Sequence, residues 1–206
     1  MIAGHNGAGK STCYRKYLHK VVAPHIQEHI DPDVIGRGIR SDWTGAPRSD
    51  LEFSMLARNE AIKLRMMYLD NEIAFSFETV FSDPASDKLN FLEEAVRRGY
   101  FVVLLAVGLD SPEKSKERVA LRVSRNGHNV PPQKIIERYP RVLSNIVKGV
   151  SLASIALVVD NSEDNVIDDG DAYFAIALFA DGKLLESVED APEWWRVAYE
   201  QCEDRS

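Results

Sequence analysis

The sequence contains few cysteines, no long hydrophobic run and no excess of positive charge. Only Cys13 and Cys202 are present among 206 residues, which excludes a disulfide framework and the clustered ligands of a structural zinc site. No stretch approaches the ~20 apolar residues that a membrane-spanning helix needs, and the N-terminus lacks the residue order of a signal peptide. We therefore expect a cytoplasmic protein with no membrane partner.

The charge balance limits the possible partners. The chain carries 25 Lys and Arg against 32 Asp and Glu, a formal net charge of −7. An acidic surface repels polyanions, so nucleic acid is not expected as a partner and any anion site must be a local basic pocket. The length fits a single domain over residues 1–206, with a core at about 1–162 and a C-terminal hairpin and helix at about 170–202.

Apolar runs that favour strands alternate with segments of helical spacing. Strands are expected at residues 1–3, 29–30, 73–77, 101–107 and 155–159, and helices at 10–22, 51–69, 89–98, 111–125, 131–147 and 191–201. Segments 173–179 and 183–185 flank a hairpin turn. This order predicts an α/β fold with a doubly wound, mainly parallel sheet, helices on both faces and a small C-terminal hairpin. The first strand is short for the centre of a sheet, which favours missing upstream residues.

A glycine-rich turn follows the first apolar run. The segment from Gly4 to Ser11 reads G-H-N-G-A-G-K-S and matches the Walker A pattern G-x-x-x-x-G-K-[ST] at every position. Its glycines let backbone N–H groups surround an anion, Lys10 reaches the β- and γ-phosphates, and the Ser11 hydroxyl is a ligand for Mg²⁺. The predicted ATP-binding residues of this P-loop are Gly4, His5, Asn6, Gly7, Ala8, Gly9, Lys10, Ser11 and Thr12.

Other segments narrow the class of P-loop protein. The sequence has no N-K-x-D guanine signature and no L-S-G-G-Q signature of ABC ATPases. A kinase of a small molecule is the leading interpretation. A nucleotide-binding switch ATPase, in which hydrolysis only changes conformation, is the alternative from a different class.

Beyond the P-loop, several segments resemble the zeta toxin family of P-loop kinases. These segments are 29–33 (H-I-D-P-D), 75–79 (F-S-F-E-T), Gly99-Tyr100 and 118–132, and the resemblance covers about residues 2–162. It implies an ATP- and Mg²⁺-dependent transfer of the γ-phosphoryl group to a hydroxyl of a UDP-N-acetyl-sugar such as UDP-N-acetylglucosamine, and a small antitoxin as partner. A kinase of another hydroxylated metabolite or nucleotide is the alternative.

Acidic residues follow two of the expected strands. The resemblance matches Asp33 to the family's substrate-activating aspartate and Glu78 to a glutamate that contacts the sugar substrate. A carboxylate here can accept the hydroxyl proton of the acceptor. Asp31 and Asp33 could instead cap a turn or helix around Pro32, and Glu78 could hold a Mg²⁺-bound water. After this glutamate the family has a glycine and then a threonine that contacts the substrate. Here Glu78 is followed directly by Thr79, which is therefore the candidate for that contact.

Three arginines share one face of the helix expected at 111–125. Arg118, Arg122 and Arg125 are spaced i, i+4 and i+7, and facing a triphosphate they can neutralise charge on the transferring group. Arg122 matches the family's first catalytic arginine, and His128 stands where the second is expected, so Arg125 is the candidate to replace it. A solvated helix face is the other interpretation, above all for Arg118.

The last central strand is followed by Asp160-Asn161-Ser162. Related kinases contact the adenine ring at this place, so Asn161 is a candidate ATP contact, although a plain turn is equally consistent. Trp194 and Trp195 are expected to be core residues, not a base-stacking platform. The predicted catalytic set is therefore Lys10, Asp33, Arg122 and Arg125, and the predicted acceptor contacts are Asp33, Glu78 and Thr79.

Overall fold

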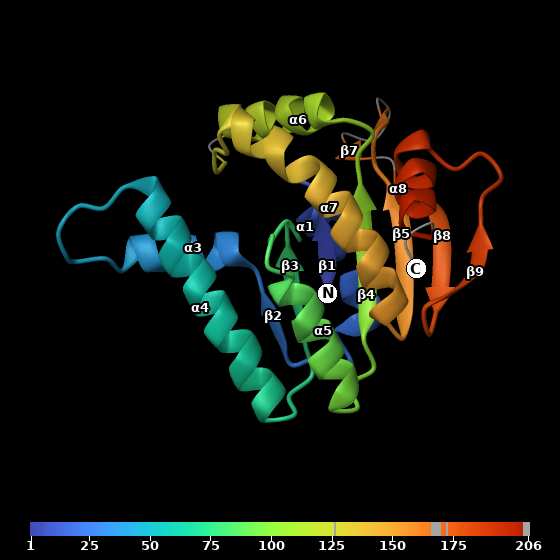
Figure 1. Ribbon diagram of the computed structural model, residues 1–206. Coiled ribbons are helices and arrows are strands. Elements are labelled where there is room, and N and C mark those ends of the chain that lie inside the picture. Colours follow the sequence, from blue (N-terminus) through green and yellow to red (C-terminus); the bar gives the residue numbers. More distant parts are fainter. Residues whose placement is uncertain (126, 166–169, 172, 204–206) are drawn as a thin grey trace. The chain divides into compact units, whose positions relative to one another are not determined.

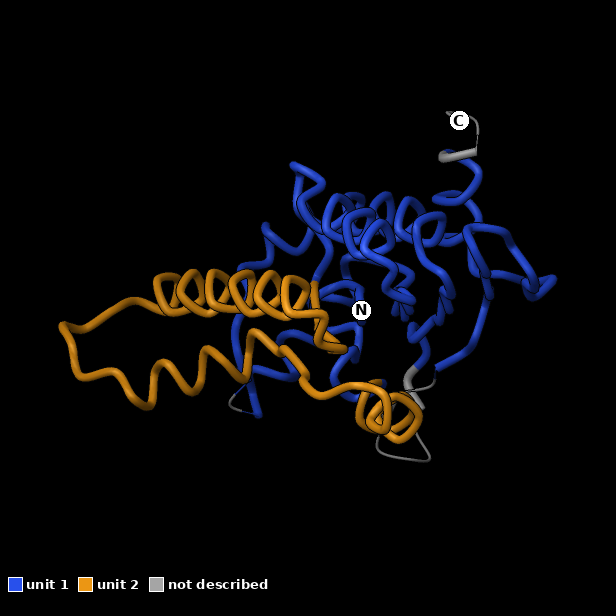
Figure 2. Tube along the Cα trace, turned by 90° about the horizontal axis from the view of Figure 1, so that it is seen from below, with its two compact units in different colours: residues 1–13, 80–206 blue, residues 14–79 orange. Residues whose placement is uncertain are grey.

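The chain folds into alternating strands and helices (Figure 1). The computed structural model describes residues 1–125, 127–165, 170–171 and 173–203. These residues form two compact units, coloured separately in Figure 2. Unit 1 contains residues 1–13 and 80–206, and unit 2 contains residues 14–79.

The sheet of unit 1 combines parallel strands with a C-terminal hairpin. Strand β4 (Val103–Gly108) pairs in parallel with β1 (Ile2–Gly4) and with β5 (Ile155–Asp160). Strand β8 (Phe174–Ala180) then pairs antiparallel with β5, and β9 (Lys183–Ser187) pairs antiparallel with β8. A separate short antiparallel pair is formed by β6 (Asp164–Asn165) and β7 (Gly170–Asp171).

Helices cover the sheet of unit 1 and complete its core. They are α1 (Lys10–Cys13), α5 (Asp87–Arg97), α6 (Pro112–Ser124), α7 (Pro132–Leu152) and α8 (Glu193–Glu203). The successive residues Leu104, Leu105 and Ala106 of β4 are all buried, so both faces of this strand are covered, as in parallel α/β sheets. Trp194 and Trp195 are buried as well, which confirms their expected place in the core.

Unit 2 is a helical segment built around two parallel strands. Strand β2 (Glu28–Ile30) pairs with β3 (Phe75–Thr79). The helical elements are η1 (Tyr14–Leu18), α2 (His19–Val22), α3 (Pro32–Ser41) and α4 (Asp50–Asp70). Element η1 is a π-helical segment, so the helix expected at 10–22 consists of an α-helical first turn, a π segment and a last α-helical turn.

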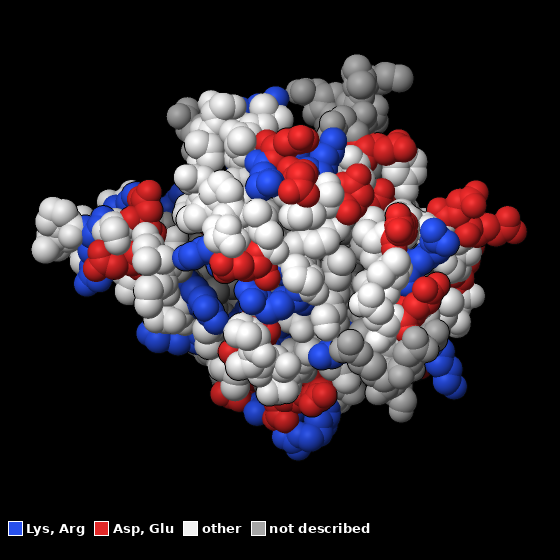
Figure 3. Space-filling model, turned by 45° about the horizontal axis from the view of Figure 1, so that its top comes forward, with Lys and Arg blue, Asp and Glu red and all other residues white. Residues whose placement is uncertain are grey.

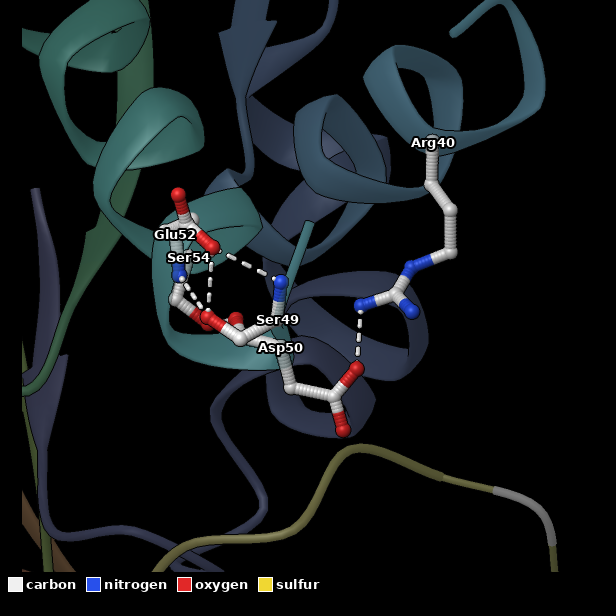
Figure 4. Close-up of polar contacts among 5 residues, drawn as sticks. All are labelled: Arg40, Ser49, Asp50, Glu52 and Ser54. Atoms are coloured by element: carbon white, nitrogen blue, oxygen red, sulfur yellow. Dashed lines mark hydrogen bonds and ion pairs between the residues drawn. The ribbon is translucent and has the colours of Figure 1, made fainter. Parts of the chain in front are cut away.

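Polar contacts fix the start of the long helix α4 (Figure 4). Ser49 Oγ accepts from the backbone N–H of Glu52, and the Glu52 carboxylate accepts from the backbone N–H of Ser49 at 2.8 Å. This reciprocal capping box satisfies two backbone donors that the first helical turn leaves without helical partners. Arg40 at the end of α3 pairs with Asp50 at 2.8 Å, an exposed ion pair that adds little to stability.

The structure confirms the α/β class, the mainly parallel strands and the C-terminal hairpin. One local prediction differs from it. The strand expected at 73–77 lies at Phe75–Thr79, so Glu78 and Thr79 belong to the strand and do not follow it. The segment after Asp31 is helix α3, which confirms the alternative that Asp31 caps a helix around Pro32: its carboxylate accepts from the backbone N–H of Asp33 at 2.8 Å.

Candidate active site

The glycine-rich loop of unit 1 runs from the end of β1 to the start of α1. A Cβ atom added to Gly4 would lie 2.1 Å from the carbonyl oxygen of Val107, so only glycine fits against β4 here. Gly7 has a φ of +73°, and an added Cβ would lie 3.0 Å from the Cβ of Arg118. The loop therefore has a backbone shape that side chains at these positions would prevent.

Lys10, the first residue of α1, folds back over the loop. Its Nζ donates to the carbonyl oxygens of Gly4 at 3.1 Å and of His5 at 2.8 Å. The ammonium group is thus held beside the backbone that a phosphate group would approach. Ser11 and Thr12 follow on the same helical turn, where the Ser11 hydroxyl could serve as a Mg²⁺ ligand.

Three side chains from other elements hold the carbonyl groups of the loop. Because the C=O and N–H of a peptide unit point in opposite directions, a carbonyl bonded to the surrounding protein turns an N–H toward the inside of the loop. Sequence reasoning did not identify two of these residues, Ser115 and Tyr173. The contacts are Ser115 Oγ to Asn6 at 2.5 Å, Asn161 Nδ2 to Ala8 at 3.0 Å, and Tyr173 OH to Gly9 at 2.7 Å.

Asn161, the predicted adenine contact, is fully buried directly after β5. Besides its side-chain bond to Ala8, its backbone N–H donates to the carbonyl of Gly108 at 3.1 Å. These bonds support the loop from the end of the parallel sheet. A contact with the adenine ring stays a prediction.

His5, in the loop, is buried against an aromatic ring. It is 2% exposed, and its ring stacks on Tyr139 of α7 with centroids 4.4 Å apart and planes 16° apart. Tyr139 is itself fixed by a 2.7 Å bond from its hydroxyl to the carbonyl of Leu109. Burial, and secondarily the charge of Lys10, lowers the pKa of His5 to about 3. The imidazole is therefore neutral at physiological pH.

The arginines expected on one helical face are placed differently from one another. Arg118 and Arg122 lie on α6, where Arg118 donates to the carbonyl of Glu163 at 3.1 Å and Arg122 to that of His128 at 2.6 Å. Arg125 is the C-cap residue of this helix and is exposed. The first two side chains are thus oriented by backbone carbonyls of neighbouring loops, and their role toward phosphate stays a prediction.

The acidic residues gather at the carboxyl ends of the two strands of unit 2. Ile30 of β2 pairs with Phe77 of β3, so Asp31 and Glu78 directly follow two paired residues. Burial of Asp31 and the nearby charge of Glu78 raise the pKa of the Asp31 carboxyl. Glu78 is 6% exposed, an unusual setting for a carboxylate unless other groups compensate its charge. Binding of a ligand near Asp31 can therefore be coupled to protonation of its carboxyl group.

Asp33 and Thr79 complete the predicted acceptor contacts. Asp33 lies exposed in the first turn of α3, and Thr79 is the last residue of β3 and is buried. The predicted residues thus form two groups. The P-loop, Asn161 and the arginines belong to unit 1, while the acidic residues and Thr79 belong to unit 2.

Sequence reasoning missed a histidine beside Glu78. His29 Nε2 lies 3.6 Å from the Glu78 carboxylate, and its Nδ1 lies 2.7 Å from Ser76 Oγ. A signal for it exists in the sequence: side chains alternate along strands, so His29 shares a face of β2 with the position of Asp31, and Ser76 shares a face of β3 with Glu78.

The fold and the loop define a nucleotide-binding protein of the P-loop class. The sequence profile described as Zeta toxin matches residues 1–171, and the chain belongs to this family. Zeta toxins are P-loop kinases, so membership of the family supports phosphotransferase activity for this chain. No curated protein matches the chain in sequence.

Two solved structures share the fold. A chain from the PezAT chromosomal toxin–antitoxin system of Streptococcus pneumoniae superposes with a TM-score of 0.56 at 15% identity, over 98% of this chain and 84% of that one. A chain from the AvrRxo1-ORF1:AvrRxo1-ORF2 structure with sulphate ions superposes with a TM-score of 0.54 at 20% identity. In the latter case the match covers 96% of this chain but only 62% of the other protein. Within the part of the chain that the structure describes, no helix has the length and apolar character needed to cross a membrane.

Proposed function

We propose that this protein uses ATP and Mg²⁺ to phosphorylate a hydroxyl of a UDP-N-acetyl-sugar such as UDP-N-acetylglucosamine. The observation that carries the proposal is the loop of residues 4–11, whose carbonyls are bonded from three sides while Lys10 lies over it. Such a loop offers N–H donors and one cation to a triphosphate. The choice of a UDP-sugar rests on membership of the zeta toxin family.

The described residues fit Mg²⁺ as an ion that arrives with the nucleotide. No group of three or more His, Cys, Asp or Glu side chains among them could hold a metal alone. Mg²⁺ commonly uses few protein ligands together with phosphate oxygens and water, and Ser11 would be such a ligand. When bound, the ion neutralises charge on the phosphates.

Each residue then has a role in an in-line transfer. Lys10 would bind the β- and γ-phosphates, and Arg122 and Arg125 would neutralise charge on the transferring group. Asp33 would accept the proton of the attacking hydroxyl, and Glu78 would hold the acceptor. Since phosphoryl transfer needs little covalent help from the protein, positioning and electrostatics would supply the catalysis.

The acidic surface is consistent with a small acceptor. Figure 3 shows basic and acidic side chains interspersed in small groups over the face it presents. With a net charge of −7, the chain has no general attraction for nucleic acid, and anion binding depends on local groups such as the loop. We therefore expect a small metabolite as the acceptor.

An acceptor panel tests the proposal. ADP release and the mass of the product are followed with Mg·ATP and UDP-N-acetylglucosamine, UDP-N-acetylgalactosamine, UDP-glucose, UMP or N-acetylglucosamine. A UDP-N-acetyl-sugar should accelerate ADP release and gain one phosphate. If only UMP or another acceptor outside the UDP-N-acetyl-sugars is phosphorylated, the protein is a kinase of a different acceptor. ADP release that no acceptor accelerates would indicate a switch ATPase.

Two lysine variants provide the control. Lys10→Ala should lack transfer, while Lys63→Ala, an exposed substitution on α4, should retain it.

We also infer a small antitoxin as protein partner. The support is family membership and the likeness in fold to a chain of the PezAT toxin–antitoxin system. Expression of the chain alone should arrest bacterial growth, and co-expression of the short reading frame beside its gene should relieve the arrest. Normal growth on expression of active enzyme would argue against a toxin.

A further inference from the structure

One face of the β2–β3 pair carries a continuous polar cluster. His29 and Ser76 are direct partners in the strand register, and His29 Nδ1 lies 2.7 Å from Ser76 Oγ. The ring of Tyr14 stacks on that of His29, with centroids 4.0 Å apart and planes 7° apart. Ser76 Oγ also donates to the Tyr14 hydroxyl at 3.5 Å. The stacked Tyr14 ring therefore fixes the plane of the imidazole, and the contact with Ser76 fixes the rotation of the ring within that plane.

This fixed ring turns its other nitrogen toward Glu78. His29 Nε2 lies 3.6 Å from Glu78 Oε1, with the histidine side chain 25% exposed and the glutamate side chain 7% exposed. At 3.6 Å the two atoms lie beyond hydrogen-bond distance, so a proton on Nε2 makes this contact an electrostatic attraction. If Nδ1 also carries a proton, it donates to Ser76, whose own hydroxyl then donates onward to Tyr14, so every contact has a donor.

Glu78 shares this end of the strand pair with a second carboxyl group. Glu78 is buried, and burial of Asp31, followed by the charge of Glu78, raises the pKa of the Asp31 carboxyl. The aromatic Phe77 points to the opposite face of the strand, where Arg65 of α4 lies over its ring at 4.9 Å. On the same face as Glu78, the Nε2 atom of His29 lies beside the carboxylate and can present a proton to it.

We propose that His29 is a positioning residue for the acceptor site: the electrostatic contact of its Nε2 with the Glu78 carboxylate holds that carboxylate in one orientation, and the Tyr14–Ser76 pair holds the imidazole. This inference rests on the proposed role of Glu78 as an acceptor contact. A carboxylate that is held in advance loses less freedom when it binds the acceptor hydroxyls. Loss of His29 should therefore weaken acceptor binding more than it slows transfer at saturation.

The test compares two substitutions of His29 that remove the ring nitrogens, one without and one with a hydrogen-bond donor. His29→Phe keeps a flat ring against Tyr14 but has no donor, whereas His29→Gln has a donor amide that can reach a carboxylate. Steady-state kinetics are measured with UDP-N-acetylglucosamine at saturating Mg·ATP. His29→Phe should raise KM for the acceptor roughly 10-fold with a smaller change in kcat and none in KM for ATP. His29→Gln should restore most of the loss.

A double-mutant cycle shows whether the effect passes through Glu78. If it does, His29→Phe adds little to the loss caused by Glu78→Gln, because the group that His29 positions has already been changed. If the losses of the two single variants multiply in the double variant, the inference is overturned. An acceptor KM for His29→Phe equal to that of wild type would also overturn it. Equal losses in His29→Phe and His29→Gln together with lowered melting temperatures would assign His29 to the fold and also overturn it.

The same cycle separates this inference from the proposed function. Should Glu78→Gln leave acceptor KM and kcat unchanged, the acceptor role of Glu78 fails, whatever His29 does. Ser76→Ala is a second probe that keeps the ring stack and removes the partner of Nδ1. It should raise acceptor KM by a smaller factor than His29→Phe, and an unchanged KM would show that Ser76 does not orient the ring.

Discussion

The hydroxyl of Tyr173 donates to the carbonyl oxygen of Gly9 at 2.7 Å, across 164 positions of the sequence. Tyr173 directly precedes strand β8 of the C-terminal hairpin, and Gly9 directly precedes the lysine of the P-loop. The hairpin therefore does more than extend the sheet. It supplies a bond that orients the last peptide units of the loop.

Tyr173→Phe removes this bond and keeps the ring. A hydrogen bond contributes ~0.5–1.5 kcal/mol, so we expect the Kd for ATP to rise roughly 2- to 10-fold, with a smaller change in kcat. Titration of ATP by calorimetry measures the effect. Tyr199→Phe is the control, because the Tyr199 ring packs against Trp195 on α8. ATP affinity equal to that of wild type would show that the loop keeps its shape without Tyr173.

Much of the fold could be predicted because it depends on local patterns. The apolar run at 101–107 became β4, and the apolar spacing at 51–69 became α4. The sequence offers a helix after Asp31 only as an alternative to a turn, since the segment contains Gly36 and Gly38, which disfavour helices. The strand expected at 73–77 begins and ends two residues before β3. The reason is that the last residues of β3, Glu78 and Thr79, are polar although they are buried.

The candidate site likewise contains residues that could be predicted from the sequence and residues that could not. The P-loop could be predicted because its glycines, lysine and serine are adjacent in sequence and each has a chemical reason to be there. Tyr173 and Ser115 could not, since their bonds join distant segments and a hydroxyl in a sequence gives no indication of its partner. His29 is an intermediate case, for strand alternation places it on a face with known candidates while its distance to Glu78 requires the structure.

The capping box of α4 gives a prediction about stability (Figure 4). Ser49→Ala removes the side chain that accepts from the backbone N–H of Glu52, and we expect a loss of ~1 kcal/mol in the free energy of unfolding. Ser54→Ala is the matched control, because the hydrogen bond of Ser54 Oγ among the described residues goes back to the Asp50 carbonyl in the same helix. Its effect should stay within ~0.5 kcal/mol. Urea unfolding measures both, and equal effects would contradict a special role for the cap.

His5 predicts a dependence of stability on pH. Its pKa is lowered from 6.5 to about 3 in the folded protein, so the unfolded chain takes up the proton first as the pH falls. The contribution of neutral His5 is complete above pH 6.5 and is lost progressively toward pH 3, by at most ~1.4 kcal/mol per pH unit.

His5→Phe keeps a ring beside Tyr139 and removes the titration. The free energy of unfolding, measured by urea at several pH values, should therefore fall more steeply with acid in wild type than in His5→Phe. The difference between the two curves isolates His5 from the carboxylates that titrate in the same range. Parallel curves would mean that His5 titrates alike in the folded and unfolded states.

The last prediction separates a kinase from a switch ATPase through Asp33. Asp33→Asn keeps the shape of the side chain but removes its capacity to accept a proton, and positioned general bases contribute ~10²–10⁴-fold. The backbone bond from Asp33 to the Asp31 cap is unaffected by this change, so the start of α3 should stay intact. ATP affinity should stay close to that of wild type while transfer to the acceptor falls by the stated factor. Transfer at the wild-type rate would exclude Asp33 as the base and direct attention to Asp31 or Glu78, and joint loss of ATP binding and transfer would assign the carboxylate to the metal or the fold.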